Sequence, residues 1–260
     1  MPFIVSATNA EITNQGTNWL FRIHAHDGQL ADLVPQHLVQ AIGAKKPGII
    51  AVADDFGLGA SRGMQATLTA LGTPAVAATS YAPTDRDMSA QLLDIQARGA
   101  DSLIVFGRPG DVALVLKQPK ALGLDMLRIG NASMVAQTTL NNLSAAEADG
   151  AVAVGGMIPQ TSTDPKIRAW AEAVERKLKV PADNFTVAYY DAVQLLRDII
   201  PRVGCDRAAI RDALAATKDF PGMLIRYTAD SRGDLAHTLG IYRNRGKTPE
   251  LTSPIQERGF

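Results

Sequence analysis

Short apolar segments alternate with helix-like segments through the middle of the chain, and this alternation constrains the fold more than any other feature. Five of the apolar segments are expected to be strands, spanning residues 48–54, 75–81, 101–107, 126–130 and 150–157. A continuous apolar run is typical of a strand buried on both faces, as in a parallel sheet. The repeated strand–helix pattern therefore predicts an α/β fold with parallel sheets flanked by helices.

Two helices of this middle region are less regular than the others. Pro119 falls inside the helix predicted for residues 111–123. Because proline removes a backbone hydrogen bond, we expect it to kink or interrupt that helix. One more helix is predicted near residues 133–142, between the last two strands.

The segments outside the middle region have a different character. Three long helical patterns follow Pro159, and they begin near Pro165, Asn184 and Cys205. A strand-rich tail comes last, in which we expect two strands around a glycine-containing turn within residues 222–244.

Charge and composition exclude several classes of partner. The 260 residues include 26 Lys and Arg against 26 Asp and Glu, so no basic surface for nucleic acid is expected. No apolar stretch approaches the ~20 residues of a membrane span, which predicts no direct membrane insertion. The first residues lack the basic and apolar regions of an export signal, so the chain as written would stay in the cytoplasm. Cys205 is the only cysteine, which excludes an intramolecular disulfide.

A glycine-rich loop resembles a phosphate-binding loop; it is AVADDFGLGASRG, at residues 51–63. The dinucleotide fingerprint is not met, since Arg62 occupies the third glycine position and no acidic residue ends the next strand. Asp54 and Asp55 would also repel a pyrophosphate. The loop therefore predicts a tight turn into a helix and no nucleotide, and no cofactor is expected.

No set of catalytic or metal-binding residues stands out. His24 and His26 would share one face of a strand, but no third ligand lies at a supporting spacing, so we expect a solvated strand end. The chain lacks the G-x-S-x-G nucleophile motif. We therefore expect no metal site and no enzymatic activity.

The order of several segments carries more information than any single motif. FIVSATNAEIT, FRIHAHDGQLADLV and GIIAVADDFGLGASRGMQATLTALG come first, and SYAPTDRDMSAQLLDIQARGADSLIVFG, DVALVLKQPKALGL, YYDAVQLL and DRAAIRDAL follow. Together they resemble the branched-chain amino-acid (leucine/isoleucine/valine) family of periplasmic substrate-binding proteins of ABC transporters. The resemblance covers essentially the whole chain.

The resemblance implies a two-lobe, type I periplasmic-binding-protein-like fold. Residues 1–45 and 160–222 would form a partial N-terminal lobe, and residues 46–158 a complete C-terminal lobe. Residues 223–260 would be a hinge-proximal, β-rich tail. Because family members have further residues before the point that matches Met1, the resemblance also implies that the N-terminal part of the first lobe is lacking.

The resemblance also implies a set of ligand contacts in an inter-lobe cleft, from a loop after the first strand and from three later strand ends: Ser6, Ala7, Thr8, Phe56, Arg108 and Asn131. The loop would hold a carboxylate through backbone N–H groups and the Thr8 hydroxyl, and Phe56 matches the cleft aromatic. Asn131 falls where amino-acid binders place an acid for the ligand ammonium. With Arg108 nearby, an aromatic or aliphatic acid is as plausible a ligand as an amino acid, unless Arg108 is only a rim side chain in water.

The function implied is capture of a small carboxylate-bearing solute, an amino acid or an organic acid, for an ABC permease complex in the periplasm. Two alternatives share the fold: a cytoplasmic ligand sensor and a non-functional gene fragment. An NAD(P)-dependent oxidoreductase is the alternative that the glycine loop disfavours.

Overall fold

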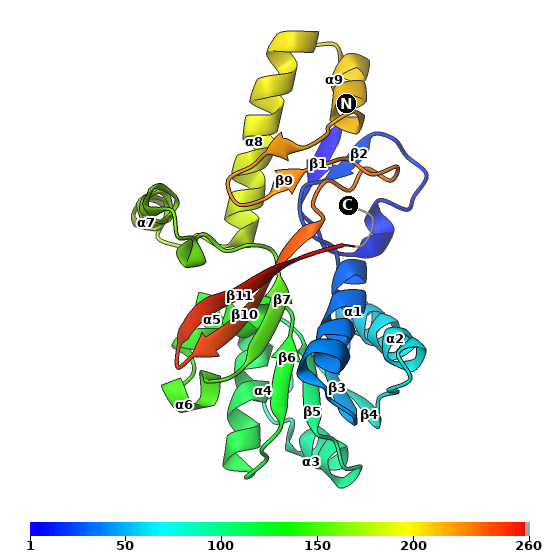
Figure 1. Cartoon of the computed structure of the whole chain (residues 1–260), viewed down its shortest axis with the longest axis vertical. Helices are drawn as coiled ribbons and strands as arrows, with labels where there is room; N and C mark the ends of the chain where they lie inside the picture. The colour runs from blue at the N-terminus through cyan, green and yellow to red at the C-terminus, as the bar shows by residue number, and fades with distance from the viewer. Residues whose placement is uncertain (258–260) are drawn as a thin grey trace. The chain divides into compact units, whose positions relative to one another are not determined.

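The computed structural model describes residues 1–257, and the chain divides into two compact units (Figure 1). The first unit comprises Met1–His26, Gly156–Gly240 and the residues from Pro254. The second comprises Asp27–Gly155 and Ile241–Ser253. The lobe boundaries that the sequence implies stay a prediction.

The second unit is built on a seven-stranded sheet of order β11-β10-β7-β6-β5-β3-β4. The strands are β3 (Pro47–Val52), β4 (Ala77–Tyr81), β5 (Ser102–Phe106), β6 (Leu127–Gly130), β7 (Val152–Gly155), β10 (Thr238–Arg245) and β11 (Thr248–Gln256). The pairs from β4 to β7 are all parallel, with Ile49 opposite Ile104 and Ala78. The predicted α/β fold with a mainly parallel sheet is confirmed.

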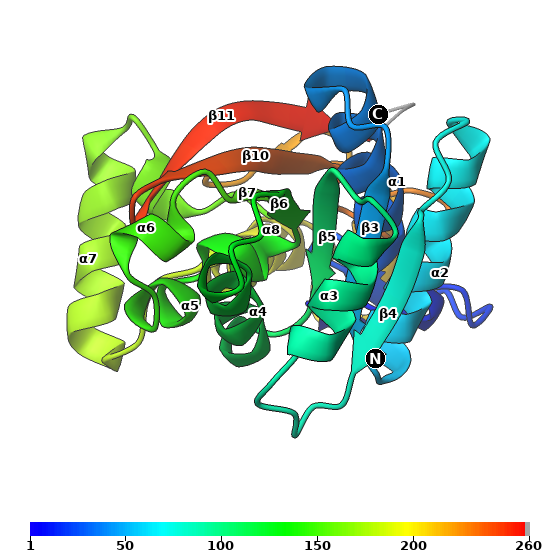
Figure 2. The same ribbon diagram turned by 90° about the horizontal axis from the view of Figure 1, so that it is seen from below.

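Helices cover both faces of this sheet, as Figure 2 shows. On one face α1 (Asp27–Gln36), extended by a π-helix at His37–Ile42, packs against α2 (Asp55–Ala70). The other face carries α3 (Ser89–Ala97) and α4 (Pro109–Ala121). Six apolar residues within the predicted strand ranges are buried in the core: Ile49, Val52, Leu103, Val105, Val152 and Val154. Burying each contributes roughly 1.5–3 kcal/mol.

The helices of this unit differ from expectation in two places. α4 continues through Pro119 to Ala121, so the proline does not interrupt it, and the kink that was the alternative stays a prediction. The single helix expected near residues 133–142 is instead a 3-10 turn at Ala132–Val135 followed by α5 (Gln137–Asn141). A short helix that the sequence did not predict, α6 (Ala145–Ala148), follows and begins with a capping box at Ser144.

The first unit contains the three helices that the sequence predicts after Pro159. These are α7 (Pro165–Leu178), α8 (Asn184–Val203) and α9 (Arg207–Ala215). Each begins after an aspartate whose side chain accepts a backbone N–H of the first turn: Asp164, Asp183 and Asp206. Two short sheets complete the unit: β1 (Phe3–Val5) parallel to β2 (Leu20–Arg22), and β8 (Phe220–Pro221) antiparallel to β9 (Arg226–Tyr227).

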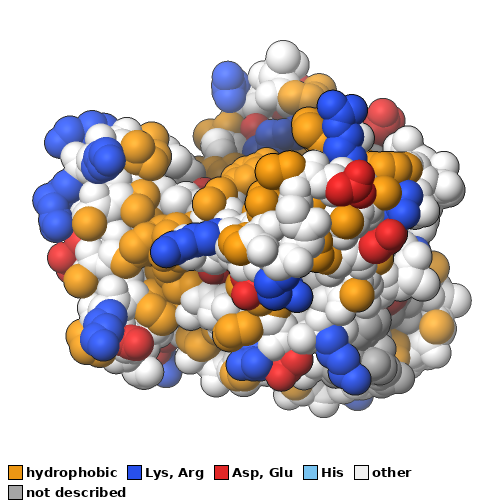
Figure 3. Space-filling view, turned by 90° about the horizontal axis from the view of Figure 1, so that it is seen from above, with side chains coloured by type: hydrophobic (Ala, Val, Ile, Leu, Met, Phe, Trp, Pro, Cys, Tyr) orange, Lys and Arg blue, Asp and Glu red, His pale blue; other side chains and the backbone are white. Residues whose placement is uncertain are grey.

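The two faces of α8 have different surroundings. Its inner face packs into the core of the first unit, which is formed by Phe21, Ile23, Ala188, Ala192, Leu195, Ile199, Leu214, Tyr227, Leu235 and Ala236. Its outer face carries the exposed apolar stripe of Phe185, Tyr189, Val193 and Ile200. In the space-filling view of Figure 3, hydrophobic side chains form patches on the face that is seen, with Lys and Arg side chains scattered among them.

Within residues 1–257, no helix combines the length and the apolar character that a membrane crossing requires.

Candidate functional site

Four polar or aromatic side chains gather at the carboxyl ends of three neighbouring strands in the second unit. Asp54 and Phe56 follow β3, Arg108 follows β5, and Asn131 follows β6. The chain passes from β3 to β4 on one side and then to β5 on the other side of β3, so a topological switch point lies between β3 and β5. Ligands of open α/β sheets bind outside the carboxyl ends of strands at such a point.

Asp54 joins the start of α2 to Arg108. It is the N-cap of α2, and its Oδ1 accepts the Gly57 N–H at 2.9 Å. Its Oδ2 accepts a hydrogen bond from Arg108 Nη1 at 2.6 Å. Burial by itself would raise the pKa of this carboxyl, but the Gly57 N–H and the Arg108 guanidinium outweigh it and lower the pKa below its usual value. Asp54 is therefore ionised at neutral pH, and the Arg108 charge is already paired.

Phe56 lies half-buried between an aromatic ring and a cation. Its ring centroid is 4.8 Å from that of Phe106, with the two planes tilted by 41°. The Arg108 guanidinium carbon lies 5.2 Å from the Phe56 centroid, within the range of a cation–π interaction. Arg108 thus contacts both Phe56 and Asp54, but its side chain is 53% exposed, so the alternative interpretation of a rim residue stays open.

Asn131 is buried and contacts the backbone next to Arg108. Its Nδ2 donates to the Gly107 carbonyl at 3.0 Å, and Ser133 Oγ donates to the same oxygen at 2.8 Å. Asn131 Oδ1 is buried and accepts no hydrogen bond from the described residues. The side chain therefore supports the turn that leads to Arg108 and keeps one acceptor available.

The predicted carboxylate-binding loop follows β1 in the first unit. Ser6 is 3% exposed, and its Oγ has no hydrogen-bond partner among residues 1–257. Ala7 is exposed and Thr8 is half-buried. The six predicted ligand contacts thus lie three in each unit, and the prediction that they bind one ligand is not tested by this geometry.

His24 and His26 differ from the expected solvated strand end. β2 ends at Arg22, and both imidazoles are buried. His24 Nδ1 donates to the Ala25 carbonyl at 2.7 Å, its Nε2 accepts from Asn184 at 2.8 Å, and its ring stacks on Phe185. Burial lowers the pKa of His24, so the ring is neutral at neutral pH.

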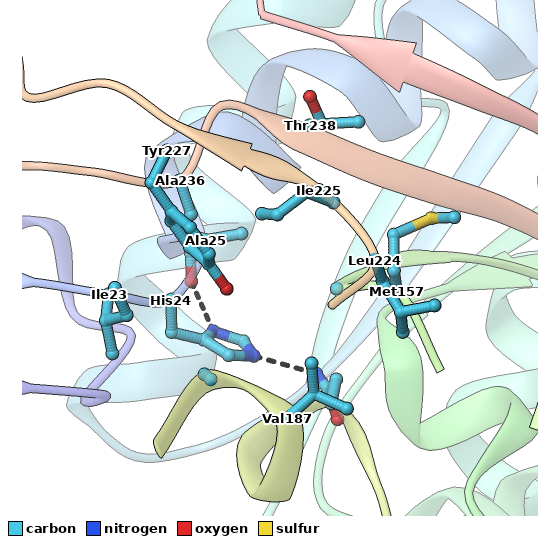
Figure 4. Close-up of a pocket in the computed structure, with 13 residues that line it drawn as sticks. Ile23, His24, Ala25, Met157, Val187, Leu224, Ile225, Tyr227, Ala236 and Thr238 are labelled. Atoms are coloured by element: carbon cyan, nitrogen blue, oxygen red, sulfur yellow. Dashed lines mark hydrogen bonds between the residues drawn. The ribbon is translucent and has the colours of Figure 1, made fainter. Parts of the chain in front are cut away.

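Figure 4 shows a small cavity beside His24 in the first unit. Its volume is about 20 Å³, which is room for about one water molecule. Apolar side chains such as Met157 and Ile225 form part of its wall, and its volume is far below the roughly 300–1,000 Å³ of small-molecule pockets. Among the described residues, no three His, Cys, Asp or Glu side chains are grouped to hold a metal ion.

Sequence reasoning missed two charged residues. From the sequence, Asp54 is treated only as a group that repels phosphate, although an aspartate between a strand and the start of a helix is a signal for an N-cap. Arg22 lies on the predicted strand of FRIHAHD, yet its guanidinium is fully buried and binds the loop after β1. Its partner Asp234 is far away in sequence, so no local pattern could have revealed it.

A family model described as periplasmic binding protein matches residues 1–248. A Leu/Ile/Val-binding protein of Rhizobium johnstonii is 27% identical over 245 residues, which are 92% of this chain and 65% of that protein. The chain thus spans about 65% of the length of this curated relative.

Two solved structures show the same fold. One is a leucine binding protein of Thermotoga maritima, with a TM-score of 0.85, 20% identity, and coverage of 100% of this chain and 74% of that one. The other is a solute binding protein of R. palustris in complex with benzoate, with a TM-score of 0.81, 20% identity, and coverage of 99% and 72%.

Proposed function

We propose, from the premise that this chain belongs to the periplasmic binding protein family, that it binds a small carboxylate-bearing solute for import. Members of this family are substrate-binding proteins and not enzymes, and the relatives include Leu/Ile/Val-binding proteins. The nucleotide-dependent oxidoreductase considered for the glycine loop is thereby excluded. The ligand, the permease complex as partner and the periplasmic location of this protein are parts of the proposal.

The observation that carries the proposal is the cluster at the switch point of the second unit. Phe56 offers an apolar face, Asn131 a hydrogen-bond acceptor, and Asp54 and Arg108 a charged pair, all at the carboxyl ends of β3, β5 and β6. A site with one aromatic surface and a few fixed polar groups suits a small amphiphilic molecule. No group in the cluster is arranged for proton transfer or nucleophilic attack.

The loop after β1 supplies the proposed carboxylate contacts. Ala7 and Thr8 offer backbone N–H groups, and Ser6 and Thr8 offer hydroxyls. Oriented neutral donors of this kind hold an anion without a countercharge. Since Arg108 is already paired with Asp54, we assign recognition of the carboxylate to this loop.

The Asp54 carboxylate bears on whether the ligand is an amino acid or an acid without an amine. The absence of an acid at position 131 favoured ligands without an amine. Asp54 now places a carboxylate beside Phe56 and Arg108, where a ligand ammonium could be accepted. The proposal therefore includes branched-chain amino acids as well as aromatic and aliphatic acids, and the benzoate complex named above shows that this fold accommodates the second kind.

Calorimetric titration with leucine, isoleucine, valine and benzoate tests the proposal. We expect saturable binding of at least one of them, and Phe56→Ala should weaken it about tenfold, as truncation of an aromatic contact residue does. Leu58→Ala is the matched control, because Leu58 is an exposed apolar residue of the same helix turn outside the cluster. Equal affinity of Phe56→Ala and the wild type, or no binding of any of the four, would contradict the proposal.

A further inference from the structure

We infer that Arg22 is a positioning residue for ligand binding, because its buried guanidinium holds the loop of residues 7–13 in the conformation that presents N–H groups to a carboxylate. This inference rests on the proposed function, and it assigns to a residue without ligand contact the task of shaping the binding loop.

Arg22 binds the loop at four points. Its Nη1 donates to the carbonyls of Asn9 at 2.7 Å and Ala7 at 3.3 Å. Its Nη2 donates to the Ala10 carbonyl at 3.2 Å and to Thr13 Oγ1 at 2.5 Å. The guanidinium is fully buried, so the loop wraps around a cation that has no access to water.

Asp234 completes the arrangement on the other side of the guanidinium. Its Oδ1 accepts from Arg22 Nε at 2.8 Å, and Thr13 Oγ1 lies 3.2 Å from both carboxylate oxygens, so its hydroxyl donates to them. Arg232 and His26 face the same carboxylate, at 3.7 and 3.8 Å. The Arg22 charge is therefore compensated within the protein, and a solute carboxylate would be held by oriented dipoles rather than by this cation.

The hydrogen bonds to Arg22 determine which way the loop carbonyls point. Because the carbonyls of Ala7, Asn9 and Ala10 are turned toward the guanidinium, they are not directed at a solute. A carbonyl aimed at the solute would repel a carboxylate. Ser6 Oγ, buried at the start of the loop without a partner among the described residues, is a second and independent indication that a polar ligand completes this site. A flat guanidinium with several fixed donors suits such a task, whereas the single ammonium of lysine does not.

The test compares Arg22→Lys with Leu214→Ala. The lysine keeps the charge opposite Asp234 but cannot reach all of the loop carbonyls. Leu214→Ala leaves a cavity in the same core and serves as the matched control for lost stability. Affinity for leucine and benzoate, and for their amides leucinamide and benzamide, is measured by calorimetry well below the melting temperature of each variant.

We expect Arg22→Lys to weaken binding of the carboxylates about ten- to a hundredfold, the effect of losing one or two hydrogen bonds to a charged group, and to leave the amides nearly unchanged. Leu214→Ala should keep the wild-type preference for carboxylates. An unchanged preference in Arg22→Lys, or the same loss in both variants, would overturn the inference.

A second measurement decides the question without ligand. Backbone hydrogen exchange of residues 7–13 should become about tenfold faster in Arg22→Lys and in Thr13→Val, and stay at the wild-type rate in Leu214→Ala. Equal exchange in all variants would show that Arg22 does not hold the loop. If the wild type binds none of the probes, the proposed function fails, and the exchange data still decide whether Arg22 positions the loop.

Discussion

Asp54 shows how strongly the role of a residue depends on partners that are distant in sequence. The sequence places it at a strand end before a helix, but the Arg108 partner lies 54 residues further on. His24 also depends on partners that are distant in sequence, since Asn184 and Phe185 on α8 contact its buried ring. Local patterns predicted that these residues lie near strand ends; they could not predict their charge pairing or burial.

Substitutions at Asp54 should separate its two roles. Asp54→Asn keeps an N-cap acceptor and loses the ion pair, which is partly exposed, so we expect a loss of only about 0–1 kcal/mol in the free energy of unfolding. Asp54→Ala loses the cap as well and should cost about 0.5–2 kcal/mol more. Urea unfolding measures both. Equal stability of the two variants would show that the cap contributes nothing.

Single elements were predicted best where burial dominates. β3, β5 and β7 are predominantly apolar and buried at every residue, and a run of this kind is typical of a buried parallel strand. β11 was not predicted as a separate strand, and it contains Pro249 and Pro254, a residue type that disfavours strands. It forms nevertheless, since it is the edge strand of the sheet, where a proline need not donate a hydrogen bond. The glycine-containing turn expected within residues 222–244 is present, since the Asp230 N–H donates to the Asp234 carbonyl and Tyr227 forms an antiparallel bridge with Ala236.

The contact of α8 with β9 should give the protein a pH-dependent stability. Asp191 on α8 is buried and accepts the Tyr227 hydroxyl at 2.9 Å and the Met223 N–H at 3.0 Å. Burial raises the pKa of this carboxyl, although both hydrogen bonds act in the opposite direction. The folded state therefore holds the proton more tightly than the unfolded chain, and the free energy of unfolding should fall as pH rises from about 4 to the raised pKa.

Tyr227→Phe should extend this pH range upward, because Asp191 loses a donor that stabilises its charged form. We expect a loss of about 1–3 kcal/mol at pH 7, and a smaller loss at pH 4, where the carboxyl is protonated in both variants. Tyr189→Phe, at an exposed position of the same helix, is the control and should have no effect. Chemical unfolding across pH 4–8 makes the comparison, and a loss independent of pH would count against a charged Asp191.

At the scale of the whole molecule, the order of the segments predicted the family and the fold. Composition predicted only that no basic surface for nucleic acid and no membrane span are expected. The pattern of buried strands determines the sheet of the second unit. The ligand contacts proposed for the two units depend instead on side chains such as Phe56 and Thr8, which no hydrophobic period encodes. These contacts therefore come from the family resemblance and stay proposals.

The balanced charge of the chain, 26 basic against 26 acidic residues, leaves little repulsion between molecules near neutral pH. The apolar stripe of α8, on which Tyr189 is 54% and Val193 60% exposed, offers them a common surface. Exposed apolar patches of this kind favour association, so we expect the protein to self-associate with rising concentration, most strongly near its isoelectric point of about 6.9.

Replacing Tyr189 and Val193 together by serine should shift sedimentation velocity profiles toward the monomer. Leu93→Ser removes an apolar side chain that is 45% exposed on α3, away from α8 in sequence, and should leave the profiles unchanged. If both variants sediment like the wild type, the stripe is not the surface through which the molecules associate.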